Sequence, residues 1–189
     1  MEYQTRRYPL FSACGLNCAL CPRFHTAGSS RCPGCAGEGF SAVHPSCGIL
    51  SCCQRKGVEY CFQCDVYPCK KYDGADLADS FITHRNQFRD MESARQGGMD
   101  AYATALCEKA GLLNKLLKDF DDGRRKGFYC AAVNLLDLQD VKDVVSRIEA
   151  ETNPETAPKD KASAAVRLFE QMAGTRGISL KLRKRAKPA

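Results

Sequence analysis

In the larger, C-terminal part of the chain, apolar residues recur at the three- and four-residue spacing that places them on one face of an α-helix. The pattern begins at Phe81, pauses at Gly97 and Gly98, and returns over residues 102–120 and 128–136. A last stripe follows Asp137, a candidate N-cap. We therefore expect a helical bundle with a four-helix core over residues 75–150. A Pro-containing linker at 151–160 and a C-terminal helix at 161–175 complete this part of the chain.

The N-terminal segment, residues 12–74, shows no helical or strand period. Between Cys14 and Cys69 it holds seven Gly and four Pro but only twelve large apolar residues. Ordering the backbone costs about 1 to 2 kcal/mol per residue, which so few apolar side chains cannot offset. A structural Zn²⁺ contributes on the order of 10 to 16 kcal/mol, comparable with the stability of a whole domain. We therefore expect an irregular, metal-stabilised module that packs on the α-helical bundle.

Cysteine supplies the ligands for such a metal. The chain has 13 cysteines, and 11 of them lie between Cys14 and Cys69. Three C-x2-C pairs stand out, each typical of a zinc knuckle, a tight turn in which two thiolates converge on one ion. We predict ten metal ligands: Cys14, Cys18, Cys21, Cys32, Cys35, Cys47, Cys52, Cys61, Cys64 and Cys69.

Ten candidate ligands indicate two zinc ions, because tetrahedral zinc takes four ligands. In the simplest partition the two ions are held by Cys18, Cys21, Cys32 and Cys35, and by Cys47, Cys52, Cys61 and Cys64. Cys14 and Cys69 are then extra or substitute ligands. Such pairs often interleave, so the prediction concerns the ligand set and leaves its partition open.

Three cysteines fall outside this set. Cys53 follows Cys52 directly and cannot easily share its ion, so we expect Cys53 to be a free thiol. Cys107 and Cys130 lie in helical, apolar surroundings that favour buried, inert thiols.

The opening C-x3-C-x2-C array of Cys14, Cys18 and Cys21 is also the spacing by which radical S-adenosylmethionine enzymes hold a [4Fe–4S] cluster. Those enzymes need a barrel of alternating strands and helices, and the helical pattern here argues against one. An iron–sulfur cluster outside that class stays open as the alternative cofactor, because clusters and zinc use the same thiolate ligands.

Charge is distributed unevenly along the chain. The net charge is +6, and a tail at 176–189 holds six basic residues and no acidic one. The rest of the chain is therefore neutral. A neutral body without a basic stripe argues against nucleic-acid binding, except through this tail.

Several function classes lack support. No stretch approaches the roughly 18 apolar residues of a membrane span, and no signal peptide is recognisable, so we expect a cytoplasmic protein with reduced thiols and no membrane contact. There is no Ser-His-Asp set, P-loop or dinucleotide-binding glycine pattern, and hence no catalytic constellation. Our leading hypothesis is a structural zinc module that serves interaction or regulation with an unknown protein partner. The alternative is an iron–sulfur or thiol-redox protein, or a metalloenzyme accessory protein.

Four Cys-containing segments together resemble a known family. They are the run from Cys14 to Pro22, the pair Cys32/Cys35, the run from Cys47 to Cys52, and the run from Lys56 to Cys69. Their order and spacing are similar to those of an uncharacterised family of Cys-rich bacterial and archaeal proteins, the domain of unknown function DUF 3795. The resemblance is clearest over residues 12–74, and it implies a metal-binding domain without an established activity.

Overall fold

Seven α-helices and three short 3-10 turns form the regular structure of residues 3–184, which the computed structural model describes. The α-helices are α1 (Phe40–Val43), α2 (Gly48–Lys56), α3 (Gln87–Gly97), α4 (Met99–Asp119), α5 (Lys126–Leu135), α6 (Leu138–Glu151) and α7 (Pro158–Thr175). The 3-10 turns are η1 (Cys18–Leu20), η2 (Cys61–Gln63) and η3 (Lys70–Tyr72). Within residues 3–184 there is no strand, and no helix is both long and apolar enough to cross a membrane.

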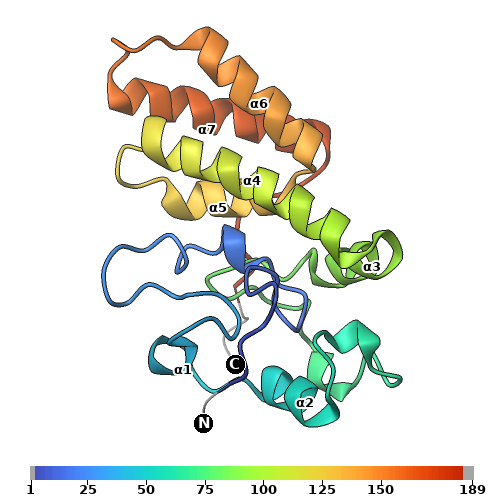
Figure 1. Ribbon diagram of the computed structural model, residues 1–189. Helices are drawn as coiled ribbons and strands as arrows, with labels where there is room; N and C mark the ends of the chain where they lie inside the picture. The colour runs from blue at the N-terminus through green and yellow to red at the C-terminus, as the bar shows by residue number, and fades with distance from the viewer. Residues whose placement is uncertain (1–2, 185–189) are drawn as a thin grey trace, which may run out of the picture.

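The predicted helical character of the C-terminal part is confirmed. Figure 1 shows α4 to α7 stacked on one side of the molecule, the N-terminal module with α1 and α2 on the other, and α3 at their junction. Leu113, Ile148 and Phe169 are fully buried in the core of the bundle. Helix α7 begins at Pro158, which suits a first helical turn because an N–H at that position would have no helical partner. The expected linker therefore shortens to residues 152–157.

The first helix of the bundle begins at Gln87 and not at Phe81. Asp79 explains the difference, because its carboxylate accepts the His84 N–H at 2.8 Å and holds the intervening residues in a loop. Phe81 lies on this loop and is 44% exposed.

Helix α2 was not predicted, because the Cys-rich segment shows no helical period. It begins at a cap: the Cys47 thiol accepts the Leu50 N–H at 3.5 Å, in the position that Ser or Asp usually fills. It ends at Gly57, whose left-handed conformation, with φ of 66°, is typical of a helix C-terminus. The helix buries Leu50 and Cys53, three residues apart on one face.

One buried side chain, Asn17, fastens the module to three helices of the bundle. Its Nδ2 donates to Asp90 of α3 at 2.7 Å and to the Asn134 side chain of α5 at 3.0 Å. Its Oδ1 accepts the Tyr102 hydroxyl of α4 at 2.9 Å. The amide group of Asn17 therefore links elements that are far apart in the sequence.

The module and the bundle also share a hydrophobic core. Phe11, Leu20 and Tyr60 of the module are buried in the same cluster as the side chains of α4 to α7. A second, smaller cluster belongs to the module alone and contains Phe40 and Leu50 beside several cysteines. The module therefore depends on the bundle for much of its apolar burial.

Beyond α7 the chain returns to the module along residues 176–184, here called the strap. At its start, two guanidinium nitrogens of Arg176 donate to the buried Asp140 carboxylate. Near its end, Asp79 accepts the Arg183 N–H at 2.7 Å and lies 3.5 Å from the Arg183 guanidinium. The strap thus ties the end of α7 to the loop before α3.

Some of the cations of the basic tail lie in the strap and form ion pairs within the protein. Arg85, on the loop before α3, donates to two strap carbonyl oxygens. Arg176 and Arg183 are in ion pairs within the protein, which leaves fewer tail cations for an external anion. Arg185 and Lys187 lie outside the described residues.

We predict that Asn17→Ala lowers the free energy of unfolding by about 2 to 4 kcal/mol, because it leaves Asp90, Asn134 and Tyr102 without buried hydrogen-bond partners. Urea unfolding followed by far-UV circular dichroism measures the change. Asn114→Ala, on the exposed face of α4, is the matched control and should alter stability by less than about 0.5 kcal/mol. Equal stability of the two variants would contradict the assigned role.

Asp79 gives the strap a pH dependence. Burial raises its pKa, but the N–H groups of Arg183 and His84 and the Arg183 guanidinium outweigh burial and hold the pKa below its usual value. Such a group contributes stability above the unfolded-state pKa of about 4 and loses it as the pH falls through the folded-state pKa.

Accordingly, Asp79→Asn should be less stable than wild type at neutral pH, and the two should converge as the pH drops below about 4. Urea unfolding over a pH series tests this. Asp76→Asn, an exposed neighbour, should follow the wild-type curve throughout. A difference for Asp79→Asn that persists undiminished in acid would show that the carboxylate charge is not what holds the strap.

Candidate metal centres

The eleven cysteines of the N-terminal module separate into two groups, each around its own cavity. The first thiol cluster surrounds a cavity of about 290 Å³ and consists of Cys14, Cys18, Cys21, Cys32, Cys35 and Cys47. The second thiol cluster surrounds a cavity of about 40 Å³ and consists of Cys52, Cys53, Cys61, Cys64 and Cys69. Each of the ten predicted ligands thus lies in one cluster or the other.

Cys47 lines a different cavity from its partners in the simplest partition. It stands at the N-cap of α2, whereas Cys52 lies five positions farther along the chain. A helix rises 1.5 Å per residue, so these two positions are separated by roughly 7 Å along its axis. The helix therefore presents Cys47 to the first cavity and Cys52 to the second.

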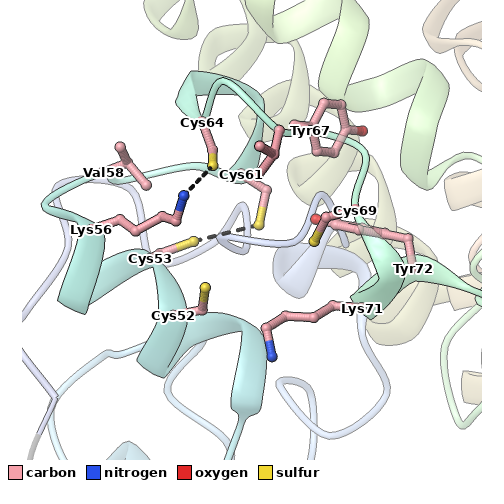
Figure 2. Close-up of a pocket in the computed structure, with 11 residues that line it drawn as sticks. Cys52, Cys53, Lys56, Val58, Cys61, Cys64, Tyr67, Cys69, Lys71 and Tyr72 are labelled. Carbon is pink, nitrogen blue, oxygen red and sulfur yellow. Dashed lines mark hydrogen bonds between the residues drawn. The ribbon is translucent and has the colours of Figure 1, made fainter.

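Cys53 was expected to be a free thiol apart from the ligands, but it lies inside the second thiol cluster. Figure 2 shows Cys52 and Cys53 on α2, facing the segment that carries Cys61. The Cys53 and Cys61 sulfurs are 3.5 Å apart. Consecutive helical residues point about 100° apart, so both cysteines of α2 can border one cavity. The missed signal was the spacing of Cys53 from Leu50, which marks the buried face of a short helix.

Tight turns position the thiols of the first cluster. Gly15 and Gly34 both have φ of 93°, a conformation that side chains disfavour. A Cβ on Gly15 would stand 2.4 Å from Met91, and one on Gly34 would stand 2.5 Å from the Pro9 carbonyl oxygen. The same Pro9 oxygen accepts the Cys35 N–H at 2.8 Å. Glycine at these positions therefore lets the cysteine turns pack closely against neighbouring backbone.

Ala13 connects the two thiol clusters. Its N–H donates to the Cys35 sulfur of the first cluster at 3.5 Å. Its carbonyl oxygen accepts the N–H of Cys61, from the second cluster, at 2.9 Å. The backbone of one residue thus contacts a cysteine of each cluster, Cys35 and Cys61.

Burial disfavours the thiolate form in the first cluster. It raises the pKa of Cys14 to about 12, and it also raises the pKa values of Cys18 and Cys35. These thiols therefore ionise only where a cation compensates for the lost hydration. A bound metal ion supplies that compensation, because it takes thiolates and releases their protons.

One thiol of the second cluster is closer to ionisation. The hydrogen bond from Cys53 lowers the pKa of Cys61 to about 7, against the opposing effect of burial. The same hydrogen bond raises the pKa of Cys53, so this pair favours a thiolate at Cys61 alone. The Lys56 ammonium donates to the Cys64 sulfur at 3.3 Å (Figure 2).

The donor chemistry of both clusters fits a metal that prefers sulfur. In a zinc tetrahedron with Zn–S bonds of about 2.3 Å, the sulfurs are about 3.8 Å apart, so the 3.5 Å between Cys53 and Cys61 suits two ligands of one ion. The other sulfurs line the two cavities and do not surround a single position where one ion could sit. Among residues 3–184, no three His, Cys, Asp or Glu side chains form a preassembled metal-binding group.

The segment that carries both clusters has relatives. Residues 10–74 match the DUF3795 family, described as a protein of unknown function. The match confirms the resemblance seen in the sequence, and it includes every cysteine of the two clusters. No curated protein and no solved structure matches the chain.

Two cysteines lie outside the DUF3795 segment. Cys130 is buried in the bundle, as predicted. Cys107 was also predicted to be buried, and this is wrong: it is exposed on α4. Its neighbour Leu106 occupies the buried stripe of the helix, which turns position 107 outward.

Gly34→Ala should lower the free energy of unfolding by about 1 to 3 kcal/mol, because φ is positive and the new methyl group would collide with the Pro9 carbonyl. Denaturant unfolding followed by tyrosine fluorescence measures the change, because five of the seven tyrosines precede α3. Gly48→Ala, in the first turn of α2 with no atom near the new Cβ, is the control and should be nearly neutral. An equally small effect at both positions would contradict the close packing described for Gly34.

Proposed function

We propose that residues 12–74 are a thiolate metal-binding module with two centres, one in each thiol cluster, and that zinc is the metal. The observation that carries the proposal is the separation of eleven cysteines into two groups around two cavities. When bound, zinc would supply binding free energy that orders the chain. We assign it a structural role, because each cluster has enough cysteines to supply all four ligands of a closed zinc site.

The small apolar core of the module supports this role. Apart from its cysteines, the cluster that belongs to the module alone contains few large apolar side chains. Burial of thiols in place of apolar residues would leave the segment weakly ordered in the metal-free form. Metal binding couples to folding in such segments, because the site forms only when the chain folds around the ion.

We further propose that the module serves interaction or regulation through a protein partner in the cytosol, where thiols stay reduced. Two large apolar side chains, Val66 of the module and Leu77 just after it, are exposed at 54% and 76%. Engagement of Arg176 and Arg183 by carboxylates makes nucleic acid a weaker candidate, because these cations are not free to bind phosphates.

The size of the first cavity favours an iron–sulfur cluster as the second candidate. A single zinc ion needs four sulfurs arranged closely around it. The six thiols of the first cluster instead surround a cavity of about 290 Å³. A [4Fe–4S] cluster also takes four thiolates but occupies more space. The protein would then be an electron-transfer or redox accessory protein.

We expect anaerobically purified wild-type protein to contain about two equivalents of zinc. Elemental analysis measures the metal, and absorption near 400 nm with a brown colour would instead identify an iron–sulfur cluster. Cys18→Ser and Cys61→Ser should each lose about one equivalent and become protease-sensitive within residues 12–74. Cys107→Ser, which removes an exposed thiol from α4, should keep the full content.

A wild-type protein that holds neither zinc nor iron would refute the proposal. Full metal content in both Cys18→Ser and Cys61→Ser would refute the assignment of the ligands. Loss of both equivalents from either variant would refute the independence of the two centres.

A further inference from the structure

Arg6 is a buried cation that lacks a carboxylate partner. Its side chain belongs to a residue only 8% exposed. Nη1 donates to the Phe11 carbonyl at 2.7 Å, and the guanidinium carbon lies 4.5 Å from the centre of the Tyr60 ring. Nε and Nη2 are buried and have no hydrogen-bond partner. Among the described residues, no carboxylate lies within ion-pair distance of Arg6.

A buried charge without a counter-ion is strongly unfavourable, and two unused guanidinium donors add to the cost. The position of Arg6 therefore calls for a nearby anion. Glu59 borders the same surface cleft as Arg6, yet its carboxylate does not approach within 4 Å. Besides Glu59, the groups near Arg6 that can carry a negative charge are the Tyr60 phenol, on whose ring the guanidinium stacks, and cysteine thiols such as Cys53, which borders the same cleft.

Arg6 lies where the two thiol clusters approach each other. Phe11, which accepts its hydrogen bond, is two residues before Ala13, the residue that bonds to Cys35 on one side and Cys61 on the other. Tyr60, on which the guanidinium stacks, directly precedes Cys61. Figure 2 shows Cys61 turned toward Cys53, and Cys53 borders the cleft that contains Arg6.

We propose that Arg6 is a positioning residue shared by both metal centres, whose permanent positive charge offsets the negative charge of the metal–thiolate groups on either side. A divalent ion with four thiolates carries a net charge of about −2, which a buried guanidinium stabilises. This inference rests on the proposed metal binding. It explains why a cation is buried with unused donors in a segment that contains no ion pair for it.

The test compares metal retention in Arg6→Met, Arg6→Lys and a control. Wild type and variants are purified identically, analysed for metal, and mixed with a chromogenic chelator at fixed neutral pH. Arg6→Met should lose metal about 10- to 100-fold faster than wild type from both centres, because residues that support metal ligands typically have effects of this size. Arg6→Lys keeps the charge and should restore most of the retention.

Arg7→Met is the matched control. It removes the same charge one residue away, from an arginine whose side chain is 72% exposed, and it should lose metal at the wild-type rate. Repeating Arg6→Met in the Cys18→Ser and Cys61→Ser backgrounds separates the two centres. Glu59→Gln should also behave as wild type, because the carboxylate is not the partner of Arg6.

Each outcome decides the inference. If wild type holds metal and Arg6→Met releases it at the wild-type rate, the inference is overturned while the proposed function stands. An effect on one centre only would overturn the shared role, and an equal effect of Arg7→Met or Glu59→Gln would overturn the assigned partner. If wild type holds no metal, the proposed function fails first, and this inference fails with it. If Arg6→Met does not fold, Arg6→Lys provides the test. Release of metal from Arg6→Lys as fast as from Cys18→Ser or Cys61→Ser would refute a role for the charge of Arg6.

Discussion

The hydrogen bonds of Asn17 fix how the cysteine module sits on the helical bundle. The side-chain amide uses both its donor and acceptor atoms, on partners from α3, α4 and α5. A buried polar network of this kind tolerates little displacement, because each lost bond leaves a desolvated group. The next residue, Cys18, faces the first cavity. Docking and the candidate centre therefore depend on the same short stretch of backbone.

The two thiol clusters are close neighbours for a related reason. The segment from Pro9 to Ala13 runs between them and provides backbone bonds to both sides. Tyr72 adds a second connection, since its hydroxyl donates to the Cys14 carbonyl while its ring lines the second cavity. The two thiol clusters therefore share supporting backbone, although each cavity has its own set of cysteines.

Sequence alone was informative where spacing reports structure directly. Regular apolar spacing identified the bundle helices, and the three C-x2-C pairs with the four cysteines near them gave ten candidates that do line the cavities. The grouping of those cysteines was not predictable, because it depends on where α2 turns Cys47 away from Cys52. The burial of Arg6 was not predictable either, because two adjacent arginines, Arg6 and Arg7, are typical of a solvent-exposed segment. Its burial arises from stacking on Tyr60, a contact between distant parts of the chain.

The strap has a consequence for the order in which the protein matures. Ser80, Phe81 and Ile82 line the first cavity, and the loop that carries them is held by Arg183 through Asp79. During synthesis on the ribosome, every cysteine of the module leaves the exit tunnel well before this arginine is added. One wall of the first cavity therefore stays unsecured in the nascent chain until residues 176–184 have been synthesised.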